Sequence, residues 1–196
     1  MLPAELVAEI AREVCTGQLT DYRLAKQRAL ARLGLPARTP LPDNRAIHAA
    51  VIDYQRLFGG SAYRAHLQQM RQAAHQAMHL LQAFAPRLVG AALSGAVTPA
   101  HHVQLHAFAD PAEAVDLFLM DRHLRYEADE RRYRYPNGQE EQVPLIRLQW
   151  QRIGVDIAVF GADDVRRVPI NPVDGKAFVR ADAAAVQRLL DASAPD

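Results

Sequence analysis

The chain has 196 residues, of which 49% are hydrophobic, and a formal net charge of +1. This length supports one sizeable core, or a helical region joined to a small α/β domain. The near-neutral charge argues against nucleic-acid binding driven by overall charge. The single cysteine, Cys15, excludes a disulfide framework and a cysteine-based zinc site.

The N-terminal part of the chain is predicted to be helical. Apolar residues at helical spacing, separated by Gly and Pro, indicate helices over residues 3–16, 22–33, 45–58 and 62–84. The first helix carries acids within its apolar pattern, which is typical of an amphipathic helix rather than a signal peptide. No apolar run reaches the roughly 20 residues that a membrane span needs. We therefore expect a cytoplasmic protein with no membrane partner.

The helix predicted over residues 62–84 contains no acidic residue. Arg64 and Arg71 are expected on its polar face, opposite a buried apolar stripe. This face is then either solvated surface, or a surface that meets phosphate, an acidic partner or a second copy of the chain.

The rest of the chain alternates strand and helix patterns. Strands are predicted over residues 87–93, 103–108, 126–135, 143–151 and 155–160, and helices over 112–123 and 182–192. The turn Pro136-Asn137-Gly138 predicts a hairpin, so the last three strands should form an antiparallel meander. The fold class is therefore α+β. A helical region (residues 1–84) is expected to pack on a small mixed β-sheet domain (residues 85–196).

Three places in the predicted sheet carry the polar residues of a candidate site. Ser94-Gly95 is a small-residue turn after the first strand. Gln104 and His106 alternate on the second strand and should therefore share one of its faces. Asp156 is the one carboxylate in the strand predicted over residues 155–160.

This outline resembles minimal nucleotidyltransferase domains over roughly residues 86–160. In that family a strand ends in Gly-Ser, the next carries an Asp-x-Asp pair that holds two Mg²⁺ ions, and a later strand supplies a third acid. The resemblance implies that Ser94 and Gly95 contact phosphate through the backbone, with their order reversed. It places Gln104 and His106 at the two metal-binding positions and Asp156 at the third acid.

The chain as a whole also resembles a family of proteobacterial proteins labelled nucleotidyltransferase-like. A VQLH strand followed by FAD and a helix, and a PVDG loop near the end, carry this resemblance. This resemblance implies a nucleotidyltransferase-like sheet domain, that is, a degenerate form of the minimal nucleotidyltransferase fold. It implies no particular activity.

The candidate catalytic positions Gln104, His106 and Asp156 hold one carboxylate where the family has three. A neutral glutamine is a poor Mg²⁺ ligand and histidine is not a hard oxygen donor, so Mg²⁺-dependent transfer is disfavoured and no metal ligand is assigned. Arg166 and Arg167, before the PVDG loop, either contact phosphate or coat the surface.

Two functions from different classes follow. The first is a nucleotidyltransferase-like protein that binds a nucleotide, RNA or another phosphate ligand with degenerate catalytic carboxylates, its status as an enzyme left open. The second is a non-catalytic protein-interaction module that retains the fold and forms a homodimer.

Histidines offer two further interpretations. His101, His102 and His106 with Asp156 have the donor types of a transition-metal site. Alternatively, His101 and His102 are exposed loop residues and only His106 faces the cleft. His75 and His79 share a helix face, but the glutamate of HExxH is absent, which favours plain surface histidines.

The run DERRYRY places arginines and tyrosines in alternation on a predicted strand. Arg131, Arg132 and Arg134 alternate with Tyr133 and Tyr135. This pattern is found in surfaces that bind single-stranded nucleic acid by stacking and phosphate contact. More often it is the pattern of a charged, solvated edge strand.

Overall fold

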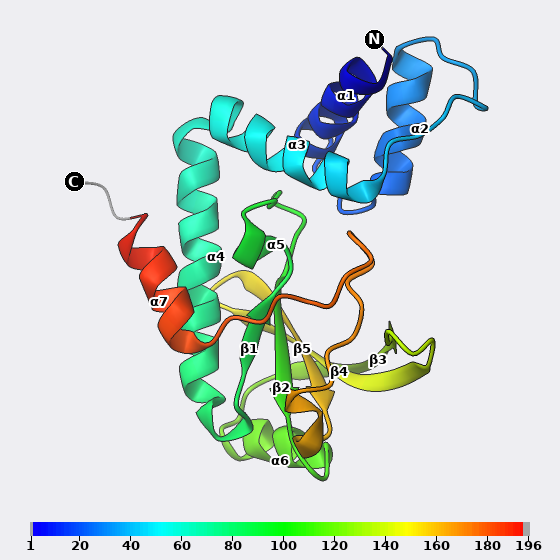
Figure 1. The fold of residues 1–196 in the computed structure, drawn as a ribbon. Helices are drawn as coiled ribbons and strands as arrows, with labels where there is room; N and C mark the ends of the chain where they lie inside the picture. Colours follow the sequence, from blue (N-terminus) through cyan, green and yellow to red (C-terminus); the bar gives the residue numbers. More distant parts are fainter. Residues whose placement is uncertain (1, 194–196) are drawn as a thin grey trace. The chain divides into compact units, whose positions relative to one another are not determined.

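The computed structural model describes residues 2–193, and the chain forms two compact units. The first contains the residues up to Leu67 together with Gly95–His101, and the second contains Gln68–Ser94 and the chain from His102 onward. The first unit therefore ends inside the long helix α4 (Gly60–Leu80) of Figure 1, earlier than the expected boundary after residue 84.

The first unit is helical. It contains α1 (Leu2–Thr16), α2 (Tyr22–Arg32), α3 (Asn44–Phe58) and the start of α4, close to the predicted ranges. Asp21 and Asp43 cap α2 and α3 by accepting hydrogen bonds from backbone N–H groups. The three helices share one apolar core, whose fully buried members include Leu6, Ile10, Val14, Ala25, Ala29, Ile47 and Val51.

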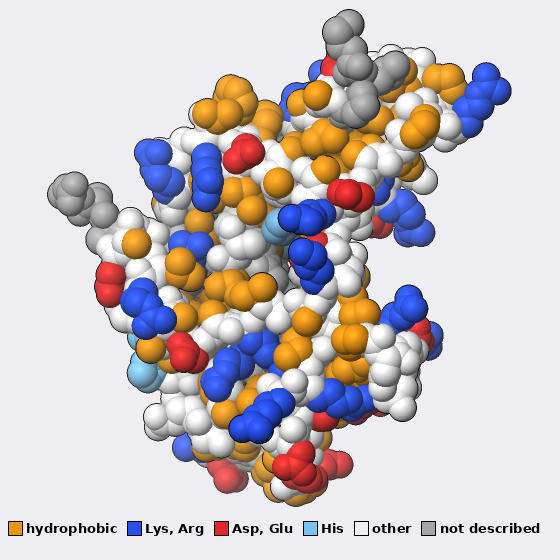
Figure 2. All heavy atoms as spheres, in the orientation of Figure 1, with side chains coloured by type: hydrophobic (Ala, Val, Ile, Leu, Met, Phe, Trp, Pro, Cys, Tyr) orange, Lys and Arg blue, Asp and Glu red, His pale blue; other side chains and the backbone are white. Residues whose placement is uncertain are grey.

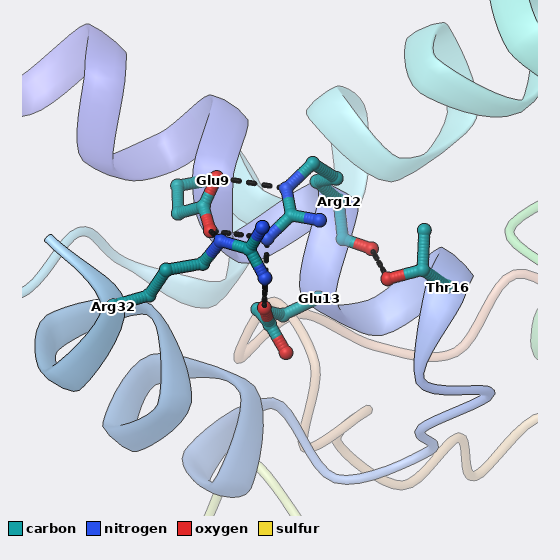
Figure 3. Close-up of polar contacts among 5 residues, drawn as sticks. All are labelled: Glu9, Arg12, Glu13, Thr16 and Arg32. Atoms are coloured by element: carbon teal, nitrogen blue, oxygen red, sulfur yellow. Dashed lines mark hydrogen bonds and ion pairs between the residues drawn. The ribbon is translucent and has the colours of Figure 1, made fainter.

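An ion network joins α1 to α2 on the outside of this core (Figure 3). Arg12 donates Nε–H to Glu9 at 2.9 Å and a second N–H to Glu13 at 2.9 Å. Arg32 of α2 reaches Glu9 at 3.2 Å. The hydrogen bond from Arg12 is the main cause of a lowered pKa at Glu9, which therefore stays charged at neutral pH.

The segment Gly95–His101 joins the helical unit because two side chains of that unit hold its backbone. Gln55 of α3 donates to the carbonyl of Val97 at 2.8 Å, and Tyr63 of α4 donates to the carbonyl of Gly95 at 2.8 Å. A segment that lies in sequence between two strands of the sheet is thus bonded to the helices.

The second unit is built on a mixed sheet of five strands. The strands are β1 (Arg87–Val89), β2 (Val103–Phe108), β3 (Tyr126–Arg134), β4 (Glu140–Trp150) and β5 (Ile153–Phe160), in the order β1-β2-β5-β4-β3. The pairs β3–β4 and β4–β5 are antiparallel, which confirms the predicted meander, while β2 and β5 are parallel. The α+β class is confirmed.

Helices and turns complete this unit. They are the second half of α4, the 3-10 turn η1 (Gln82–Phe84), α5 (Ala91–Ser94), α6 (Glu113–Asp121), the 3-10 turn η2 (Ala162–Val165) and α7 (Ala183–Asp191). Trp150 projects from the face opposite Asp156 and donates to Gln76 of α4 at 2.8 Å, so α4 lies against that face.

We call the other face of the sheet, which carries Asp156, the site face. One half of it is apolar, with a core of Phe108, Tyr133, Val143, Leu145, Ala158 and Phe160. The segment between β5 and α7, orange in Figure 1, runs over this half. Phe178 of the segment packs on the core, and the Arg180 guanidinium lies 4.9 Å from the centre of the Phe108 ring.

The first strand is shorter than predicted. It ends at Val89, and residues 91–93, expected to continue it, belong to the short helix α5 instead. Gly90 makes this change of direction possible, because its φ of 73° lies in the left-handed region that favours glycine.

Candidate functional site

The strand register places the three candidate catalytic residues on the site face. Gln104 of β2 is the direct neighbour of Asp156 on the parallel strand β5, and His106 is the neighbour of Ala158 two residues further along. Paired residues point to the same side and alternate residues share a face. Gln104, His106 and Asp156 therefore project from one face, as their spacing predicts.

Asp156 is held by side chains of the protein. Only 8% of its side chain is exposed. One carboxylate oxygen receives a hydrogen bond from His102 Nδ1 at 2.9 Å, and the other receives one from an Arg131 N–H at 3.1 Å. Both oxygens, which a metal-binding acid would present to an ion, are thus bonded to nitrogen donors.

A second arginine extends this cluster. Arg147 of β4 is the register partner of Asp156, and its Nε lies 4.0 Å from the carboxylate. The same guanidinium forms a 2.9 Å ion pair with Asp129 of β3. We name Asp156, His102, Arg131, Arg147 and Asp129 the Asp156 cluster.

The position of His102 depends on a glycine. A Cβ built on Gly154 would lie 2.5 Å from His102 Cδ2, so the imidazole rests directly on the backbone of β5. About 45% of the His102 side chain is exposed. The ring is therefore fixed on one side by Gly154 and Asp156 and open to solvent on the other.

His106 lies in different surroundings from Asp156. It is 1% exposed and is enclosed by the rings of Tyr133, Phe160 and Phe178. Arg180 donates Nε–H to its Nδ1 at 3.1 Å. The expectation that His106 faces a cleft is wrong, because the segment before α7 covers it.

Burial decides the protonation of His106. Desolvation first, and the positive charges of Arg180 and Arg131 after it, lower its pKa to about 3. The imidazole is therefore neutral throughout the physiological range and accepts a hydrogen bond from Arg180. Its Nε2 is buried without a protein partner.

The turn after the first strand lies at Gly90 and not at Ser94-Gly95. A Cβ on Gly90 would lie 2.4 Å from Gln104 Oε1, so the glycine lets the Gln104 side chain approach the backbone. Ser94 is the last residue of α5 and belongs to the sheet unit, whereas Gly95 belongs to the helical unit. The predicted tight turn at Ser94-Gly95 is wrong.

The candidate phosphate ligands Arg166 and Arg167 do not lie at the Asp156 cluster. Arg167 forms a 2.8 Å ion pair with Glu141 near the start of β4, and its guanidinium stacks 3.7 Å from the centre of the Tyr135 ring. This is the opposite end of the strand from Arg147. Arg166 is exposed beside it.

The DERRYRY strand is divided between the two faces of the sheet. Arg131 and Tyr133 project on the site face, and Arg132 on the opposite face pairs with Glu140 at 3.5 Å. Tyr133 and Tyr135 are buried, at 6% and 1% exposure. They are core residues and cannot stack on bases. Binding of single-stranded nucleic acid by aromatic stacking on this strand is therefore excluded.

The two arginines of α4 also differ from the prediction. Arg64 is exposed as expected, but Arg71 is buried at 8% exposure. It donates to the carbonyls of Ala92 and Leu93 at 3.1 and 3.3 Å, at the C-terminal end of α5. Arg71 therefore binds the last carbonyls of a short helix, which a cation there stabilises.

The Asp156 cluster is only partly predictable from the sequence. His102 is expected there either as a metal ligand beside Asp156 or as an exposed loop residue, and Arg147 and Asp129 have no predicted role. A signal was present: Arg147 is the only charge in the otherwise apolar stretch from Val143 to Leu148. In the predicted meander Asp156 is the one carboxylate of the following strand, so the two opposite charges can pair across neighbouring strands.

Within residues 2–193, no group of three or more His, Cys, Asp or Glu side chains is placed to hold a metal ion. His101 Nδ1 bonds to the Thr98 backbone N–H at 3.0 Å within the helical unit, whereas His102 belongs to the sheet unit. None of the helices in the described range is long and apolar enough to cross a membrane.

Comparison of the chain with protein-family models, with curated proteins and with solved structures finds no match.

Proposed function

We propose that this chain is a nucleotidyltransferase-like protein that binds a phosphate-bearing ligand, a nucleotide foremost, at the Asp156 cluster without metal-dependent catalysis. One observation carries the proposal. A buried carboxylate uses both of its oxygens to orient His102 and Arg131, whose side chains are 45% and 33% exposed.

Phosphate suits the donors of this cluster. Arg131 uses one N–H on Asp156, and a guanidinium has five, so several remain for an anion. Arg131 and Arg147 are 33% and 43% exposed at the side chain, and their planar donors match the geometry of phosphate oxygens. His102 can add Nε2–H when its ring is protonated.

The same contacts disfavour Mg²⁺. The charge of Asp156 is already neutralised by protein cations, and a hard cation would have to displace Arg131 or His102 to reach an oxygen. The nucleotide is suggested by the resemblance of the chain to nucleotidyltransferases, whereas the phosphate class rests on the donors alone.

Calorimetric titration with ATP, ADP and pyrophosphate, in EDTA and in Mg²⁺, tests the proposal. We expect the ligands to bind in EDTA. Arg131→Gln should weaken this binding at least about tenfold, because it removes one bidentate charged contact to the phosphate. Arg132→Gln is the matched control, because Arg132 is the next residue of β3 but projects from the other face. If the two variants bind with equal affinity, or if the wild type does not bind at all, the Asp156 cluster is not a phosphate-binding site.

Catalysis needs its own assay. We expect no Mg²⁺-dependent incorporation of labelled nucleotide into protein, RNA or a small hydroxyl acceptor. Incorporation that is abolished by Asp156→Ala would show that the remaining carboxylate supports transfer, and would contradict the non-catalytic part of the proposal.

A second candidate function, a protein-interaction module that forms a homodimer, is supported by one exposed apolar pair. Leu117 and Met120 lie three residues apart on α6 and are 61% and 59% exposed. Replacing both by glutamate should shift sedimentation towards monomer if α6 is a subunit contact, whereas Leu41→Glu, at an exposed leucine outside α6, should not. An unchanged sedimentation profile would exclude α6 as the contact.

A further inference from the structure

Two histidines on α4 present their ring nitrogens to each other, away from the Asp156 cluster. His75 and His79 lie four residues apart on one helix face. Their Nε2 atoms are 3.3 Å apart, within hydrogen-bonding distance in the metal-free protein, and the ring planes meet at 78°. His79 is exposed and His75 is half-buried, so the edge at which the two nitrogens meet can be reached from solvent.

The separation of these nitrogens is that of two ligands on one metal ion. Imidazole nitrogens bind zinc at about 2.0–2.1 Å, and two such ligands at a tetrahedral angle are about 3.3–3.4 Å apart. We infer that His75 and His79 form a two-histidine chelate for a divalent transition-metal ion, with water completing the coordination.

A negative charge lies near the pair, which favours a cation there. Asp191 at the end of α7 interacts electrostatically with His75. Its carboxylate accepts a hydrogen bond from Gln187 at 2.7 Å.

The donor set determines which metals fit. Imidazole suits Zn²⁺, Ni²⁺ and Cu²⁺, whereas Mg²⁺ prefers oxygen ligands in an octahedral arrangement. We therefore expect Cu²⁺ to bind more tightly than Zn²⁺, following the general order of divalent-metal affinities, and Mg²⁺ not to bind to this pair.

The test is a titration of the metal-free protein with ZnCl₂ and CuCl₂, followed by calorimetry and by the ¹H–¹⁵N signals of the imidazole rings. We expect calorimetry to give one ion per chain, and ring-signal shifts on Zn²⁺ addition that are confined to His75 and His79. Either His75→Ala or His79→Ala should weaken binding at least about tenfold, because each removes one arm of the chelate. His123→Asn is the control: this exposed histidine has a φ of 54°, which asparagine tolerates.

Circular dichroism melts establish that each variant is folded before its affinity is compared. Binding should also weaken at acidic pH, because protons compete with the metal ion for the imidazole nitrogens. Single variants that bind Zn²⁺ as tightly as the wild type, or a wild type no tighter than the double variant, would overturn the inference.

Discussion

Acidification should destabilise this protein through one side chain, His106. Its pKa is about 3 in the folded state, because of burial and the charges of Arg180 and Arg131, and 6.5 is the ordinary value. Between these two pH values the unfolded chain binds a proton that the folded chain does not. Stability from His106 is therefore complete above about pH 6.5 and is lost progressively as the pH falls towards 3.

The magnitude follows from the difference in proton binding. A pH of 5 lies about 1.5 units below the pKa of the imidazole in the unfolded chain. Each of these pH units lowers the free energy of unfolding by roughly 1.4 kcal/mol, so the protein is about 2 kcal/mol less stable than at pH 7.5. The side chain is 1% exposed, so solvent screening does not reduce this figure much.

Urea unfolding at pH 7.5 and pH 5, for the wild type and His106→Gln, measures the effect. Glutamine keeps an acceptor for Arg180 Nε–H but does not titrate, and the other ionisable groups are shared by both proteins. We expect the wild type to lose about 2 kcal/mol more than the variant between the two pH values. Equal losses would refute the reasoning and would mean that His106 is protonated in the folded protein at pH 5.

Two stability predictions concern backbone contacts. Gly90→Ala should lower the unfolding free energy by about 1–3 kcal/mol, because φ there is 73° and the new Cβ would meet Gln104. Adding Gln104→Ala should recover the steric part but not the backbone strain, and full recovery would contradict the conformational argument. Arg71→Gln should cost about 2–3 kcal/mol in thermal or urea unfolding, because two charged hydrogen bonds to α5 carbonyls are lost. Arg64 is an exposed position on the same helix. If Arg64→Gln lowers the unfolding free energy as much as Arg71→Gln does, the hydrogen bonds of Arg71 to α5 do not stabilise the fold.

Electrostatics of the surface agrees with the near-neutral net charge. On the face of the molecule in Figure 2, basic side chains are interspersed with hydrophobic and acidic ones. Neither RNA nor nucleotide binding can therefore rest on overall charge, and a local cluster of donors has to supply the affinity. The Asp156 cluster is such a local set.

Local sequence patterns were enough to predict most helices and strands of the fold. The apolar stripe of α3, the capping residue Asp43 and the turn at Asn137-Gly138 act over a few residues, and each element that they predict is present within a few residues of its expected ends. The period-two alternation of β2 and the single acid of β5 likewise sufficed to predict that Gln104, His106 and Asp156 share a face.

The contents of the site could not be derived in this way. Whether His106 lines a cleft depends on Phe178 and Arg180, which lie more than 70 residues away in sequence and cover it in the folded chain. The hydrogen-bond donors to Asp156 come from β3 and from the loop before β2, and no local pattern pairs them with it.

The sequence by itself determined the class of the fold, the strands and the face on which the polar residues lie, because helical and strand periodicities are properties of neighbouring residues. Only the tertiary structure decided that Asp156 is bonded to His102 and Arg131, that His106 is enclosed, and that Arg71 binds the end of α5. Each of these depends on long-range packing, in which burial and charge pairing between distant segments set the role of a side chain.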